Sequence, residues 1–100
     1  MANLRLSNLV LRAIDRAFMG PDRQLVVAEL EATNLPLAGP AERERVHFAV
    51  LLLAHGSAAS LRGALELARV DWRDVLVAAG LASENWRDAL VESGILTPRD

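Results

Sequence analysis

The stretch Asp71–Leu96, DWRDVLVAAGLASENWRDALVESGIL, contains one ten-residue phrase written twice. The first copy is Trp72–Leu81, WRDVLVAAGL, and the second is Trp86–Ile95, WRDALVESGI. The copies share their tryptophan, arginine, aspartate and glycine, which are residues that mark helix boundaries or stand next to them. The repeat therefore specifies architecture, and it predicts a pair of short helices at the end of the chain.

Each copy begins and ends with a typical helix-boundary residue. Asp71 and Asn85 precede the two tryptophans, and both residue types are preferred N-caps. Gly80 and Gly94 follow the last turn, where glycine can take the left-handed conformation that ends a helix. One long helix through the first glycine is the alternative, but an interior glycine costs about 1 kcal/mol. We therefore predict two helices.

The residues next to these caps differ between the copies. Leu81 follows the first glycine and is placed to contact Leu76 in a Schellman closure. Val70 precedes the first cap and is expected to pack against Val75 as a hydrophobic staple. Ala89 occupies the place of Val75 in the second copy and is too small for that contact. We expect the second repeat helix to be the more peripheral one.

Four more helices are predicted before the repeat. Apolar residues recur at helical spacing from Leu6 to Phe18, ahead of the helix-ending pair Gly20-Pro21. The next three helices are predicted from about 23 to 33, from Pro40 or Ala41 to Gly56, and from Ser57 or Ser60 to Val70. An extended connection is expected between the second and third helices, where two prolines and a glycine fall.

The third predicted helix is apolar on almost every side between Val46 and Ala54, which is typical of a buried helix. We expect it to be the centre of the molecule. A chain of 100 residues with 52% apolar residues is long enough for one domain, residues 1–100, with a real core. The predicted fold is an all-α, compact bundle of about six short helices.

Composition excludes several classes of function. The chain has no cysteine, which rules out disulfides and thiolate metal sites. The formal net charge is −2, so no general basic field favours nucleic acid. No apolar run reaches the length of a membrane span. Because the start MANLRLSNLV lacks the pattern of a signal peptide, we expect a cytoplasmic protein.

Residues that could carry chemistry have better structural explanations. His47 and His55 are eight positions apart, whereas metal pairs on a helix use i, i+3 or i, i+4. Asp71 and Asp74 stand where helix caps and first turns favour carboxylates. Ser57 lies in HGSAAS, which lacks the G-x-S-x-G pattern of a nucleophile. We predict no enzymatic activity, no cofactor, no metal and no small-molecule substrate.

Residues 46–81 carry a resemblance. VHFAVLLLAHGS followed by LRGALELARVDWRDVLVAAGLA resembles small all-helical bacterial proteins of high-GC genomes. Those proteins have an apolar helix and then an A-x-x-D-[WY]-R-D-x-L-x-x-A phrase. All eleven basic residues here are arginine, which agrees with such a genome. The resemblance implies no particular activity, so it transfers no functional residue.

The leading hypothesis is a non-enzymatic helical protein-interaction module that forms a homodimer or binds another protein. Its basis is surplus apolar surface in a short chain, since an uncovered apolar patch is an interface. The predicted interface residues lie off the main apolar stripes or are the repeat tryptophans: Leu11, Leu35, Leu37, Leu51, Leu67, Trp72 and Trp86.

The alternative hypothesis is a helix-turn-helix-like regulator that binds nucleic acid. Two short helices around Gly80 have about the right size. Asn85 and Arg87 could reach a base, but Glu84, Asp88 and Glu92 disfavour contact with phosphates.

Overall fold

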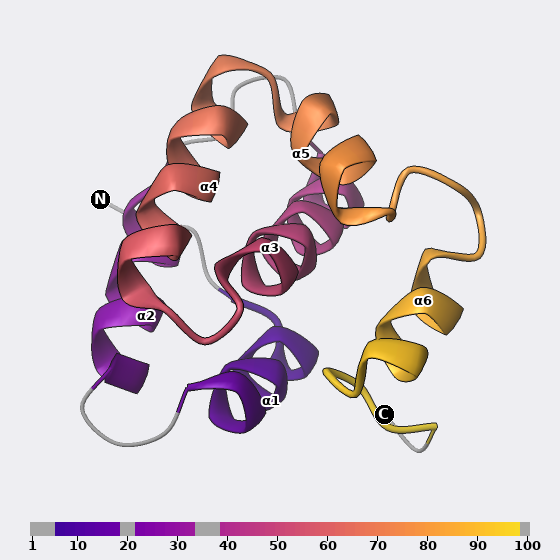
Figure 1. Cartoon of the computed structure of the whole chain (residues 1–100), viewed down its shortest axis with the longest axis horizontal. Coiled ribbons are helices and arrows are strands. Elements are labelled where there is room, and N and C mark those ends of the chain that lie inside the picture. Colours follow the sequence, from indigo (N-terminus) through magenta and orange to yellow (C-terminus); the bar gives the residue numbers. More distant parts are fainter. Residues whose placement is uncertain (1–5, 19–21, 34–38, 99–100) are drawn as a thin grey trace.

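The computed structural model describes residues 6–18, 22–33 and 39–98, and this part of the chain contains helices and no strand (Figure 1). In chain order they are α1 (Asn8–Ala17), α2 (Asp22–Ala32), α3 (Pro40–Ala54), α4 (Ala58–Val70), α5 (Trp72–Ala79) and α6 (Trp86–Ser93). The predicted all-α class and the six short helices are confirmed. The predicted helix end at Gly20-Pro21 lies outside the described residues, as does most of the extended connection between the second and third helices.

α3 is the central helix, as its apolar sequence predicted. Figure 1 shows it almost end-on, and α1, α4 and α5 pack against it. Every residue from Val46 to Leu51 is buried, including His47 at 3% exposure. A helix can bury all its faces only when other helices surround it, which is why its sequence has no polar side here.

The other helices turn apolar residues inward: α1, α4 and α5 pack against α3, and α2 packs against α1 and α4. These residues combine into a single core. Their buried members are Val10, Ala13 and Ile14 on α1, Val26 and Leu30 on α2, Leu61, Ala64, Leu65 and Ala68 on α4, Val75 and Leu76 on α5, and Leu90 on α6.

The turn between α3 and α4 differs slightly from its prediction. Gly56 has a positive φ of 78°, as a helix-ending glycine should, but His55 is already left-handed at φ 48°. The helix therefore ends at Ala54, one residue before the predicted end zone at the glycine. Of the two candidate caps for α4, Ser57 is the N-cap, and its Oγ accepts a hydrogen bond from the backbone N–H of Ser60 at 3.2 Å.

Asp71 joins α4 to α5 with a single residue. It is both the C-cap of α4 and the N-cap of α5, and its Oδ1 accepts from the Arg73 backbone N–H at 3.0 Å and from Arg73 Nε at 3.2 Å. The backbone hydrogen bond from Arg73, aided by its side chain, holds the pKa of the Asp71 carboxyl below its usual value. The predicted cap is confirmed.

The predicted staple beside this cap is wrong. Val70 is 84% exposed, so it does not pack against the buried Val75. The physical reason is that Val70 is still part of α4, which leaves no extended residue before the cap to fold back.

Both repeat helices end at left-handed glycines, which confirms two helices rather than one. Gly80 has φ 76°, and its N–H donates to Val77 O at 3.1 Å, while Leu81 N donates to Leu76 O at 2.8 Å. These two bonds form the predicted Schellman closure. Gly94 ends α6 at φ 88°.

The second copy is held less regularly than the first. Asn85 was predicted to cap α6, but it has φ −89° and ψ 26° and makes no side-chain cap bond. An N-cap needs an extended backbone to aim its side chain at the first N–H groups, and Asn85 instead accepts from Ser83 Oγ. α6 does not pack closely along any other helix of the described chain, and it lies at the edge of the bundle (Figure 1). This agrees with the prediction that the second repeat helix is the more peripheral one.

Candidate functional site

A groove opens where α6 meets the ends of α3 and α5, and we call it the α5–α6 groove. Its volume is about 390 Å³. Its lining residues are Leu52, Leu53 and His55 from α3 and its end, Ala78 and Ala79 from α5, and Ala89 and Ser93 from α6. Three of these are alanines, and the two leucines are half-buried, so the groove has an apolar floor and short side walls.

The groove is lined at one position where the repeat copies differ. Val75 of the first copy is fully buried against the core, whereas its equivalent in the second copy is Ala89, which is half-buried and lines the groove. Valine has two more carbon atoms than alanine. The smaller side chain leaves apolar space between α6 and the end of α3, which a valine would partly fill.

The polar groups of the groove are at its ends. Ser93 Oγ donates to Leu90 O at 2.7 Å and accepts from Ile95 N at 3.3 Å, so both functions of the hydroxyl close the end of α6. His55 is exposed at the left-handed end of α3. Covalent catalysis needs a nucleophile that is hydrogen-bonded to a general base. Among the described residues, neither Ser93 nor His55 is in such a pair.

Acidic residues stand beside both walls of the groove. Asp74 precedes Ala78 by one helical turn on α5, and Glu92 follows Ala89 by three residues on α6. Residues three or four apart on a helix are neighbours on its surface. Both carboxylates are exposed, so each places a negative charge about one helical turn from an alanine that lines the groove.

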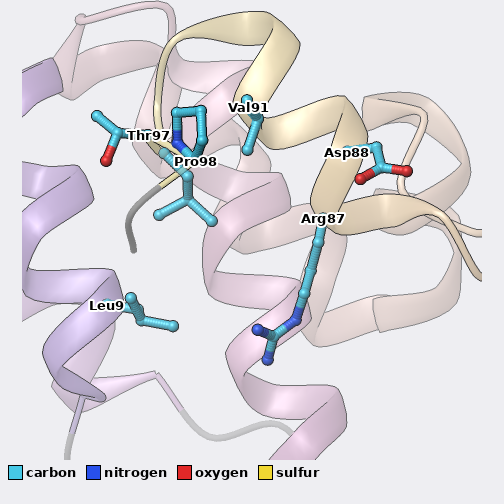
Figure 2. A pocket seen from close by; sticks show the side chains of 7 residues that line it. Leu9, Arg87, Asp88, Val91, Thr97 and Pro98 are labelled. Carbon is cyan, nitrogen blue, oxygen red and sulfur yellow. The ribbon is translucent and has the colours of Figure 1, made fainter.

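A second pocket lies on the other side of α6, against α1 (Figure 2). Its volume is about 200 Å³. It is lined by Leu9, Arg87, Asp88, Val91, Leu96, Thr97 and Pro98. Figure 2 shows Arg87 extending away from α6, and its Nη2 lies 3.9 Å from Glu44 Oε1 of α3. This pocket is about half the size of the groove, and its cation already has an intramolecular partner.

Trp86 anchors α6 to the central helix between these two hollows. The centroid of its ring is 6.1 Å from the centroid of the Phe48 ring. The guanidinium carbons of Arg45 and Arg87 lie 5.3 Å and 5.1 Å from the Trp86 centroid. Cation–π contacts of this kind stabilise an exposed ring by about 0.5–1 kcal/mol each. The contacts with Phe48 and Arg45 connect α6 to α3, whereas Arg87 belongs to α6 itself.

His47 is the one histidine of the buried core in the described ranges. Its Nε2 has no hydrogen-bond partner, and burial, with a smaller contribution from the positive charge of Arg43, lowers its pKa from 6.5 to about 4. The imidazole is therefore neutral near pH 7. His47 does not line the groove. Its lowered pKa affects the folding stability of the protein.

The predicted interface residues fall into different environments. Leu11, Trp72 and Trp86 are half-buried and pack against the core. Leu67 is exposed at 37%. Leu35 and Leu37 lie outside the described residues.

The prediction for Leu51 is wrong. This side chain is 1% exposed and belongs to the chain's own core, so it offers no surface to a partner. The apolar spacing places Leu51 off the main stripe, but α3 is buried on every side from Val46 to Leu51 and has no off-stripe face there.

Sequence reasoning did not identify the groove. Its lining residues come from three helices and include several alanines, which no motif marks. The available signal was the mismatch between Val75 and Ala89 in an otherwise similar repeat.

No family model, curated protein or solved structure matches this chain. The resemblance to helical proteins of high-GC bacteria therefore stays a prediction. Over the described ranges, no helix is both long and apolar enough to cross a membrane, and no group of three or more histidine or acidic side chains could hold a metal ion.

Proposed function

We propose that this protein is a non-enzymatic helical interaction module that self-associates through the α5–α6 groove. The observation that carries the proposal is the groove itself, a hollow of about 390 Å³ lined by leucine and alanine side chains together with His55 and Ser93, which nothing in the described chain fills. Apolar surface left in water favours association, because its burial releases roughly 25 cal/mol per Å².

The shape of the groove fits a helix. Alanine side chains at Ala78, Ala79 and Ala89 extend little from their own helices, so the backbone of an approaching helix could come close. Recognition of an amphipathic helix in an apolar groove uses anchors at helical spacing rather than many hydrogen bonds. The Ser93 hydroxyl agrees with this mode of recognition, because it already donates to and accepts from the backbone of its own chain.

A second copy of the chain is the proposed partner, because the chain also presents exposed apolar side chains. The large exposed hydrophobic residues in the described ranges are Leu25, Leu67, Val70 and Val77. A molecule that carries both an apolar hollow and apolar projections can satisfy each with the other in a homo-oligomer.

The test is sedimentation equilibrium of the wild type, A78E and a control. The repeat itself supplies the variant, because Glu92 stands in the second copy where Ala78 stands in the first. Ala78 is exposed and helical, so glutamate there preserves folding while it places a charge in the groove. The matched control is A28E, which makes the same change on an exposed position of α2.

We expect the wild type and A28E to associate and A78E to remain a monomer of 10.9 kDa. Equal association of A78E and A28E would show that the groove is not the contact. A wild type that stays at 10.9 kDa at every concentration would refute self-association itself.

A further inference from the structure

One face of α4 carries small and apolar residues that point to solvent. Ser60, Gly63, Leu67 and Val70 are all exposed, and they follow one another at steps of three, four and three residues. We call this set the α4 stripe. The steps between these residues alternate between three and four positions. Residues spaced in this way lie along one side of a helix and can contact a partner helix.

The stripe is uncovered along its length. Leu67 is 37% and Val70 is 84% exposed, although both are large and apolar. A Cβ added at Gly63 would meet no atom within 4 Å, so the glycine leaves a notch between the serine and the two large residues. α4 lies on the opposite side of the bundle from α6 in Figure 1, so a chain cannot place its own stripe in its own groove.

The stripe and the groove have complementary shapes. The stripe offers two projecting side chains, Leu67 and Val70, and the groove offers an apolar floor between alanine walls. α4 has 13 residues. Its length is therefore about 20 Å, and a hollow of about 390 Å³ has room for the Leu67 and Val70 side chains, though not for the helix itself.

The charges beside the two surfaces are also complementary. Arg62, Glu66 and Arg69 flank the stripe and give it one net positive charge, and their side chains are 59%, 70% and 50% exposed. The exposed carboxylates of Asp74 and Glu92 each lie about one helical turn from an alanine that lines the groove. Arg62 and Arg69 now pair with acidic residues of their own chain, but exposed ion pairs of that kind contribute little, so exchange for a partner's carboxylates costs little.

We infer that the α5–α6 groove of one copy receives the α4 stripe of a second copy. The inference rests on the proposed self-association and adds which surface of the partner fills the groove. The contact is therefore heterologous, because two different surfaces meet, the stripe of one copy and the groove of the other. In any such contact, one copy contributes Val70 and the other contributes Ala78.

A mixing experiment tests this directly. V70E alters the stripe and leaves the groove intact, whereas A78E alters the groove and leaves the stripe intact. Both positions are exposed, so both variants should keep the helical circular dichroism and the melting temperature of the wild type. V77E is the control, because Val77 is an exposed valine like Val70 but belongs to neither the stripe nor the groove.

We expect V70E alone and A78E alone to be monomers in sedimentation velocity at concentrations where the wild type and V77E associate. Mixed in equal amounts, the two variants should form a species of twice 10.9 kDa, since one intact stripe and one intact groove remain.

Two results would overturn the inference while self-association stands: a mixture that stays monomeric while the wild type associates, or V70E that associates as the wild type does. A monomeric wild type would instead overturn the proposed function and the inference together.

Discussion

The buried imidazole of His47 should make folding stability depend on pH in a range where few other groups titrate. The side chain is 3% exposed, and its Nε2 has no hydrogen-bond partner. The perturbation is H47L, which replaces the imidazole with an apolar side chain of similar size.

The magnitude follows from the two protonation states. The unfolded chain takes up a proton near pH 6.5, but the folded chain does so only near pH 4, because burial disfavours the cation. Stability is therefore fully present above about pH 6.5 and falls as the pH is lowered toward 4, by roughly 1.4 kcal/mol per pH unit. The whole effect is about 3 kcal/mol, a large part of the roughly 5–15 kcal/mol that stabilises a domain.

The assay is urea denaturation at several pH values between about 7 and 5, above the range where most carboxylates titrate. The free energy of unfolding of the wild type should fall by about 2 kcal/mol over this range, and that of H47L should stay nearly constant. Near pH 7 the variant should be as stable as the wild type or more so, because it removes an unpaired buried polar atom. Parallel loss of stability in both proteins would refute the reasoning.

Three further predictions concern helix ends and a helix surface, and each is measured by the midpoint of thermal or urea unfolding. D71A should lower stability by about 1 kcal/mol because Asp71 caps α5, whereas N85A should change it by only a few tenths because Asn85 makes no cap bond; equal losses would contradict the difference between the copies. G63A should raise stability by about 1 kcal/mol, since the glycine is inside α4 and its added Cβ meets nothing; a loss would show a contact at that surface. H55G should also stabilise, by about 1 kcal/mol, because His55 holds a left-handed backbone at φ 48° that glycine adopts freely; an unchanged or lower midpoint would mean that the imidazole contributes more than the backbone strain costs.

The repeat and the apolar periodicity were sufficient to predict the helices. Gly80 and Gly94 end α5 and α6 as predicted, because a left-handed helix end is a local requirement that glycine meets without help from the rest of the chain. The central position of α3 was also predictable, since a helix without a polar face must be surrounded.

The failures came where one local pattern had two possible outcomes. Asn85 has the right residue type for a cap, but the turn before it places its backbone outside the extended region. Val70 could have preceded a cap as an extended residue, but α4 continues through it. Nothing in either local sequence specifies how the chain arrives at the helix.

The groove could not be predicted because it depends on the meeting of three helices. The exchange of Val75 for Ala89 is visible in the sequence, but its consequence appears only when Leu52 and Leu53 of α3 lie opposite the missing volume. Surplus apolar composition suggested an interface, and periodicity alone assigned Leu51 to it wrongly.

Self-association is the central claim, and the molar mass of the wild type in solution tests it most directly. Light scattering behind a sizing column would be measured over a dilution series near neutral pH. The account predicts a mass that rises with concentration above 10.9 kDa. A mass of 10.9 kDa at every concentration would contradict it and would leave the groove without its proposed partner.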